Sequence, residues 1–107
     1  MNPKLVRNLI PTIIAQEKKQ DGSSRIPQFY QANDQEYWKK LKEKLLEEVT
    51  EFIDSEEIIE LADIFEVLEA IMVIRRVSLD QLTIIKNNKA RTYGTFSEKI
   101  ILTSKGD

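Results

Sequence analysis

The chain has 107 residues, of which 41% are hydrophobic and 32% charged, and its formal net charge is -2. This length and composition suit one small globular domain over residues 1–107, and the weak negative charge argues against a nucleic-acid-binding surface. The absence of Cys and His excludes disulfides, thiolate or imidazole metal sites and His-dependent catalytic triads, which leaves oxygen ligands for any metal.

Local sequence signals predict four helices. Pro11 suits the first turn of a helix, and Asn33 with Glu36 has the spacing of a capping box. Residues 54–57 repeat that spacing and indicate a turn. Because short connections make neighbouring helices antiparallel, we expect an all-α fold, a small antiparallel bundle of about four helices. The predicted helices span about 11–19, 34–53, 55–76 and 79–90.

Apolar positions give further expectations about packing. Apolar side chains surround nearly the whole helix at 55–76, so that helix is predicted to be buried. Ser78 and Gln81 open the fourth helix at cap spacing, and the apolar tail at 100–102 is expected to pack as an extended segment. A domain of this size is stable by only roughly 5–15 kcal/mol, so association with other copies is expected. The lead into the first helix should also contribute core contacts, through Leu5, Val6, Leu9, Ile10, Ile13 and Ile14.

Acidic residues are concentrated in one part of the chain. Residues 47–69 contain ten Asp or Glu and no Lys or Arg. Residues three apart share a helix face, and two such pairs, Glu48 with Glu51 and Glu60 with Asp63, fall among apolar neighbours. An ionised carboxylate in apolar surroundings must be paired, bind a metal or take up a proton, and the segment holds no base. We therefore predict a divalent-cation site; the alternative is that these acids are solvated on helix surfaces.

A carboxylate site for a hard metal usually serves phosphate chemistry. Such a site also needs cations for the phosphates, and bases from the two ends of the chain are candidates. Lys4 and Arg7 suit either a solvated surface or contacts to phosphate. Trp38 suits either the core or stacking on a base, and Tyr37 is a second candidate for stacking. The candidate substrate-binding residues are Lys4, Arg7, Lys86, Lys89, Arg91 and Trp38.

Three stretches of this sequence resemble motifs of the MazG-like all-α NTP pyrophosphohydrolases. Residues 4–14 (KLVRNLIPTII) resemble the opening K-L-V-R-D-x-I-P-x-I-I of its small phosphoribosyl-ATP pyrophosphohydrolase-like, house-cleaning branch. Residues 41–52 resemble L-x-x-K-L-x-E-E-x-x-E-F, and residues 59–68 resemble E-E-L-A-D-x-x-E-V-L. The resemblance spans most of the chain, and the combination of the three stretches is specific.

The resemblance implies a homo-oligomeric helical enzyme, a dimer or tetramer, that uses Mg²⁺ (or Mn²⁺) to hydrolyse an NTP to NMP and pyrophosphate. A metal-activated water would be the nucleophile. The residues implied as both metal ligands and catalytic groups are Glu48, Glu51, Glu60 and Asp63.

Departures from the family pattern bear on substrate placement. Asn8 stands where the family often has Asp, Tyr93-Gly94-Thr95-Phe96 replaces a Gly-Gly-Phe turn, and the spacer from Glu51 to Glu60 is short. Two alternatives stay open: a non-catalytic helical interaction module on the same fold, and a phosphoribosyl-ATP pyrophosphohydrolase, which differs only in substrate. No signal-peptide core or run of ~20 apolar residues is present, so we expect a cytoplasmic protein with no membrane partner.

Overall fold

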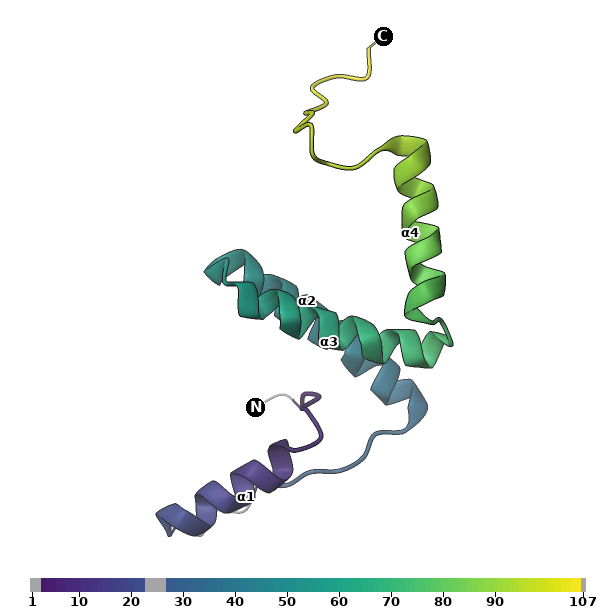
Figure 1. The fold of residues 1–107 in the computed structure, drawn as a ribbon. Coiled ribbons are helices and arrows are strands. Elements are labelled where there is room, and N and C mark those ends of the chain that lie inside the picture. Colours follow the sequence, from purple (N-terminus) through teal and green to yellow (C-terminus); the bar gives the residue numbers. More distant parts are fainter. Residues whose placement is uncertain (1–2, 23–26, 107) are drawn as a thin grey trace. The chain divides into compact units, whose positions relative to one another are not determined.

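The computed structural model describes residues 3–22 and 27–106, and within them the only regular elements are four helices (Figure 1). The all-α prediction is confirmed, and every helix begins and ends within three residues of its predicted bounds. The helices are α1 (Ile10–Asp21), α2 (Asp34–Ser55), α3 (Ile58–Arg75) and α4 (Leu79–Tyr93).

The chain forms two compact units, Met1–Ile71 and Met72–Asp107. The first unit contains α1, α2 and most of α3. The second contains the end of α3, α4 and the tail that follows it. A single domain over residues 1–107 stays a prediction.

The predicted caps define where helices begin. The side chain of Asn33 accepts a hydrogen bond from the backbone N–H of Glu36 at 2.8 Å. Ser78 and Gln81 form a reciprocal capping box, in which each side chain accepts from the other residue's backbone N–H. Because these bonds satisfy N–H groups that have no partner inside the helix, they stabilise each first turn.

The connection between α2 and α3 is only two residues long. Glu56 adopts a left-handed conformation (φ 58°) and donates its N–H to the carbonyl of Phe52, which ends α2. The side chain of Ser55 accepts from the N–H of Glu57. So tight a turn sends α3 back alongside α2 as an antiparallel hairpin within the first unit (Figure 1). The predicted turn is therefore confirmed, although α3 begins at Ile58 and not at 55.

Few apolar side chains are buried in this chain. Leu41 of α2 and Val67 of α3 are the buried apolar residues of the described part. The prediction that the whole circumference of α3 is buried is wrong for the single chain, because one neighbouring helix covers only one side of it. Leu9, Ile13 and the tail at 100–102 are also exposed, contrary to the expected packing. Exposed apolar residues of the α2–α3 hairpin are Leu46, Ile53, Ile58, Ile59, Leu61, Phe65 and Leu68.

None of the helices in the described ranges combines the length and the hydropathy that crossing a membrane requires.

Candidate metal centre

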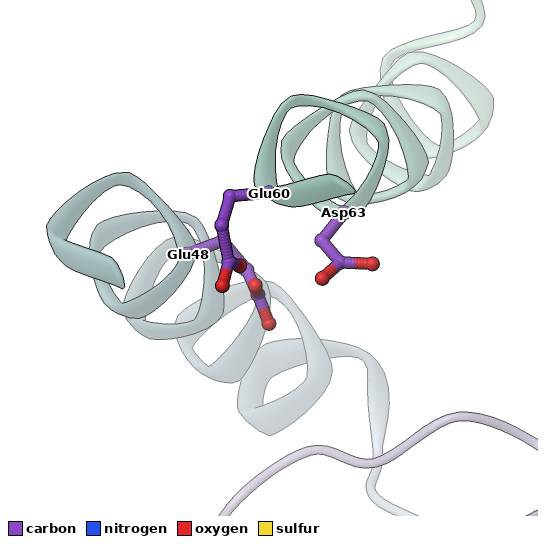
Figure 2. A group of neighbouring side chains, drawn as sticks. All are labelled: Glu48, Glu60 and Asp63. Carbon is purple, nitrogen blue, oxygen red and sulfur yellow. The ribbon is translucent and has the colours of Figure 1, made fainter. Parts of the chain in front are cut away.

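Three carboxylates converge between α2 and α3. One oxygen from each of Glu48, Glu60 and Asp63 lies within 4.8 Å of the others. Figure 2 shows the three side chains, which we call the acid cluster, pointing toward one another from the two helices of the hairpin. Glu60 and Asp63 are three residues apart and so share one face of α3. The short turn at 56–57 places that face against the part of α2 that carries Glu48.

The acid cluster contains carboxylate oxygens without a partner. Glu48 is only 7% exposed, and no other charged residue of the described part of the chain is buried. Its Oε2 atom and the Oε2 atom of Glu60 are inaccessible to water and accept no hydrogen bond from any described group. Leaving a buried acceptor unsatisfied costs about 1–3 kcal/mol, and more for a charged group. A bound cation or a proton would satisfy these two buried oxygens.

Burial and mutual repulsion raise the pKa values of two of these carboxyls. Burial, followed by the neighbouring charge of Glu51, raises the pKa of Glu48, while Lys44 opposes the rise. Burial, followed by Asp63 and then Glu48, raises the pKa of Glu60. The protein therefore disfavours the ionised forms of Glu48 and Glu60 in the absence of additional positive charge.

Glu51, the fourth predicted ligand, lies beside the cluster. It is exposed, and its oxygens are not among those that converge. Its carboxylate nevertheless influences the pKa values of both Glu48 and Glu60, so it lies near them. The structure thus brings together three of the four predicted acids and places the fourth at their edge.

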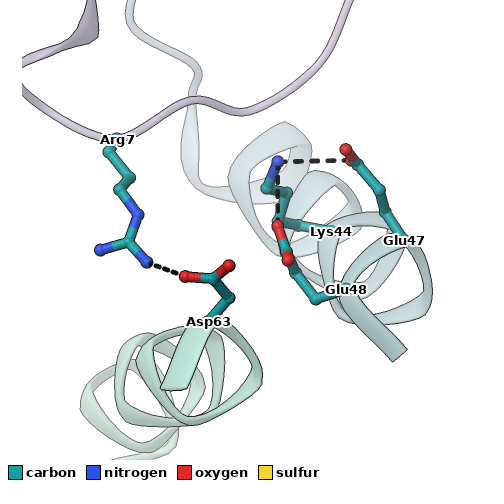
Figure 3. Close-up of polar contacts among 5 residues, drawn as sticks. All are labelled: Arg7, Lys44, Glu47, Glu48 and Asp63. Carbon is teal, nitrogen blue, oxygen red and sulfur yellow. Dashed lines mark hydrogen bonds and ion pairs between the residues drawn. The ribbon is translucent and has the colours of Figure 1, made fainter. Parts of the chain in front are cut away.

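Two bases partly neutralise the acids, and their pairing contradicts the expectation that no base would be available. Lys44 Nζ lies 3.4 Å from Glu48 Oε1 and 3.4 Å from Glu47 Oε2. Arg7 Nη2 lies 3.0 Å from Asp63 Oδ1 (Figure 3). Both bases lie outside the acidic segment at 47–69, which is why counting charge within that segment missed them. The ion pair between Lys44 and Glu48 could have been predicted, because residues four apart are neighbours on a helix. The contact between Arg7 and Asp63 could not, because 56 residues separate them in the sequence.

Positive charge from these bases does not balance the site. When ionised, the three cluster acids and Glu51 carry four negative charges, against two positive charges from Lys44 and Arg7. Lys44 is shared with Glu47, and Arg7 Nη1 also approaches Glu66 at 3.8 Å. The remaining excess of at least two negative charges matches the charge of one divalent cation.

The other predicted substrate-binding residues are divided between the two units. Lys4 and Arg7 belong to the segment before α1, and Lys86, Lys89 and Arg91 are exposed on α4 in the second unit. Convergence of all five on one site stays a prediction. Trp38 is half-buried, and its ring centroid lies 5.4 Å from Lys42 Nζ, a cation–π distance.

The positions that depart from the family pattern are also accounted for. Asn8 is exposed beside Arg7. Gly94, at φ 88°, ends α4 with its N–H donated to the carbonyl of Ala90. Phe96, which follows in the same run, is 99% exposed. This run therefore terminates a helix, and the described residues leave the side chain of Phe96 uncovered.

The chain was compared with protein families, curated proteins and solved structures. No protein-family model, curated protein or solved structure matches the chain. The resemblance to the MazG-like family therefore rests on the three sequence stretches alone.

Proposed function

We propose that this protein is a Mg²⁺-dependent nucleotide pyrophosphohydrolase, which cleaves a nucleoside triphosphate to the monophosphate and pyrophosphate. The observation that carries the proposal is the acid cluster itself, in which Glu48 and Glu60 each have a buried oxygen without a hydrogen-bond partner and converge with Asp63. The sequence resemblance supports the same activity. A cytoplasmic location remains an expectation from the sequence.

The donor set of the acid cluster fits Mg²⁺ or Mn²⁺. Hard divalent cations prefer carboxylate oxygens, and Mg²⁺ commonly takes only a few of them, together with water and substrate phosphates. Glu48, Glu60 and Asp63 would hold the ion, and Glu51, whose oxygens do not converge with theirs, stays a predicted fourth ligand. When bound, such an ion neutralises phosphate charge and lowers the pKa of an attacking water.

Arg7 and Lys44 would orient this site. A guanidinium has five N–H donors, and Arg7 uses Nη2 on Asp63 while its side chain remains 57% exposed. Its remaining donors, of which those on Nη1 lie near Glu66 at 3.8 Å, could bind a phosphate next to the acid cluster. Lys44 pairs with Oε1 of Glu48, and Oε2 of Glu48 has no hydrogen-bond partner among the described residues.

The proposal is tested with a panel of NTPs and dNTPs plus phosphoribosyl-ATP, assayed for pyrophosphate in the presence of Mg²⁺. We expect release from at least one of them, abolished by a chelator. Phosphoribosyl-ATP separates the house-cleaning activity from its histidine-pathway alternative, since the two differ only in substrate. No release from any member of the panel at saturating Mg²⁺ would reject the enzyme and favour the non-catalytic module.

We also propose that a second copy covers the exposed apolar side chains of the α2–α3 hairpin. A unit with so few buried apolar residues has little core to offset the conformational entropy lost on folding. Apolar surface of this extent is typical of association sites. Sedimentation at several protein concentrations measures this, and a monomer at every concentration would contradict it.

A further inference from the structure

A groove of about 930 Å³ lies within the first unit, between the segment before α1, residues 27–32 and the start of α2. This volume falls in the range of small-molecule sites, roughly 300–1,000 Å³. The residues of the groove that matter here are Lys4, Arg7, Phe29, Tyr30, Tyr37 and Lys40. A second hollow, of about 610 Å³, lies in the other unit beyond α4 and contains none of the acid cluster.

Charge and aromatic character distinguish this groove. It has three cations and three aromatic rings among its lining residues, and Glu36 is the single acid there. That acid is already engaged, because Glu36 Oε2 accepts a hydrogen bond of 2.8 Å from the hydroxyl of Tyr30. The lining therefore carries more cations than acids, although Lys40 also pairs with Glu43 at 3.1 Å and Arg7 pairs with Asp63 at 3.0 Å. Such a lining suits a ligand that combines an aromatic ring with negative charge.

Two polar contacts hold the walls of the groove. Lys40 Nζ donates to the carbonyl of Pro3 at 2.9 Å and attaches the N-terminal segment to α2. The bond from Tyr30 to Glu36 attaches the opposite segment to the same helix. The hydroxyl of Tyr30 is therefore held in place, and the residue as a whole is 67% exposed.

One residue connects the groove with the acid cluster, whose three acids do not themselves line the groove. Arg7 lines the groove and pairs with Asp63 at 3.0 Å. Along α2, Tyr37, Lys40, Lys44 and Glu48 fall on one face, because steps of three or four residues return to the same side of a helix. From Tyr37 to Glu48 the rise is about 16 Å at ~1.5 Å per residue, a span comparable with an extended nucleoside triphosphate.

We infer that this groove binds the base and ribose of the substrate nucleotide, with Tyr30 as the main stacking surface and the phosphates directed past Arg7 to the acid cluster. The inference rests on the proposed function and names its substrate as a nucleotide, as opposed to an inorganic polyphosphate. It assigns base stacking to Tyr30, which the sequence did not single out, and not to Trp38, which does not line the groove.

Binding measured without turnover tests the inference. The probes are the α,β-methylene analogues of ATP and UTP, which cannot be cleaved at the reacting bond, and inorganic tripolyphosphate, each with Mg²⁺ in a calorimeter. We expect at least one nucleotide analogue to bind more tightly than tripolyphosphate. Loss of one base–aromatic stack in Tyr30→Leu should weaken that analogue roughly 5- to 150-fold, while tripolyphosphate affinity stays unchanged.

Two matched variants control this experiment. Tyr30→Phe keeps the ring and should retain most of the affinity. Tyr93→Leu removes an exposed tyrosine in the other unit and should have no effect. Equal affinity of Tyr30→Leu and the unaltered protein for both nucleotide analogues would overturn the inference, even if the enzyme releases pyrophosphate. Nucleotide binding that depends on Tyr30 without any pyrophosphate release would instead reject the proposed function and leave the groove as a nucleotide site.

Discussion

The acid cluster and the groove lie along the same face of α2, yet they differ in charge and in exposure. The cluster is negative, half-buried to buried, and lacks partners for two of its oxygens. The groove is open and aromatic, and its lining has three cations and one acid. Arg7 belongs to both, since it lines the groove and pairs with Asp63. Two adjacent regions of opposite charge suit the two ends of one ligand, a metal-bound phosphate chain and an aromatic base.

Removing a carboxylate of the acid cluster should have the largest effect on activity. Glu60→Gln keeps the shape of the side chain but loses a negative charge that a cation needs. Because altering even the partners of metal ligands costs 10–100-fold, we expect the rate of pyrophosphate release to fall by roughly 100-fold or more. Mg²⁺ binding, followed by calorimetry, should weaken in parallel, while nucleotide binding in the groove persists in part.

Asp54→Asn is the matched control for this substitution, since Asp54 is an exposed acid near the end of α2 and outside the cluster. It should leave activity and Mg²⁺ affinity unchanged. The non-catalytic module makes a different prediction for Glu60→Gln: greater stability from relieved repulsion, with no activity to lose and no change in metal affinity. That result would contradict the metal centre.

Arg7 connects the acid cluster and the groove, so its replacement should affect both. We expect a smaller loss of activity than in Glu60→Gln. Arg7→Gln removes the charge that holds Asp63 and the donors available to phosphate. Truncating a partly exposed charged contact of this kind should lower kcat/KM about tenfold, or about 1.4 kcal/mol. Lys39→Gln, an exposed base on α2 outside the groove lining, serves as control. Equal kcat/KM for both variants would show that Arg7 does not link the regions.

The dependence of stability on pH should show the smallest effect. The pKa values of Glu48 and Glu60 are raised above the ordinary 4.5, so the folded protein binds more protons than the unfolded chain just above that pH. Their contribution to the free energy of unfolding is complete below pH 4.5 and is lost as pH rises through the raised values. We therefore expect metal-free Glu60→Gln to be more stable than the unaltered chain, as measured by the urea midpoint of unfolding. This difference in midpoint should be larger at pH 7 than at pH 5.

Mg²⁺ should reverse that order, because it stabilises the ionised acids of the unaltered chain. An ion at 100 times its Kd adds about 2.7 kcal/mol to the free energy of unfolding. Glu60→Gln should gain less from the same concentration. A stability difference between the two proteins that is independent of both pH and Mg²⁺ would mean that the cluster acids are ordinary surface charges.

Helix positions were predictable because their signals are local. The cap bonds of Asn33 and Ser78 involve residues three positions away, so their spacing can be read directly. Convergence of Glu48, Glu60 and Asp63 followed from helix periodicity and one short turn. Glu51 was predicted in the same way but lies at the edge, because placing a side chain at the boundary of a helix face requires the packing of the partner helix.

The sequence by itself determined the all-α class, the four helices and the acids that would face one another, since periodicity and capping act over a few residues. Only the tertiary structure decided that Arg7 reaches Asp63, that Tyr30 faces a groove next to the acid cluster, and that α3 is left largely uncovered in a single chain. Those outcomes depend on contacts between segments far apart in the chain, and neither periodicity nor spacing carries information about which distant segments will meet.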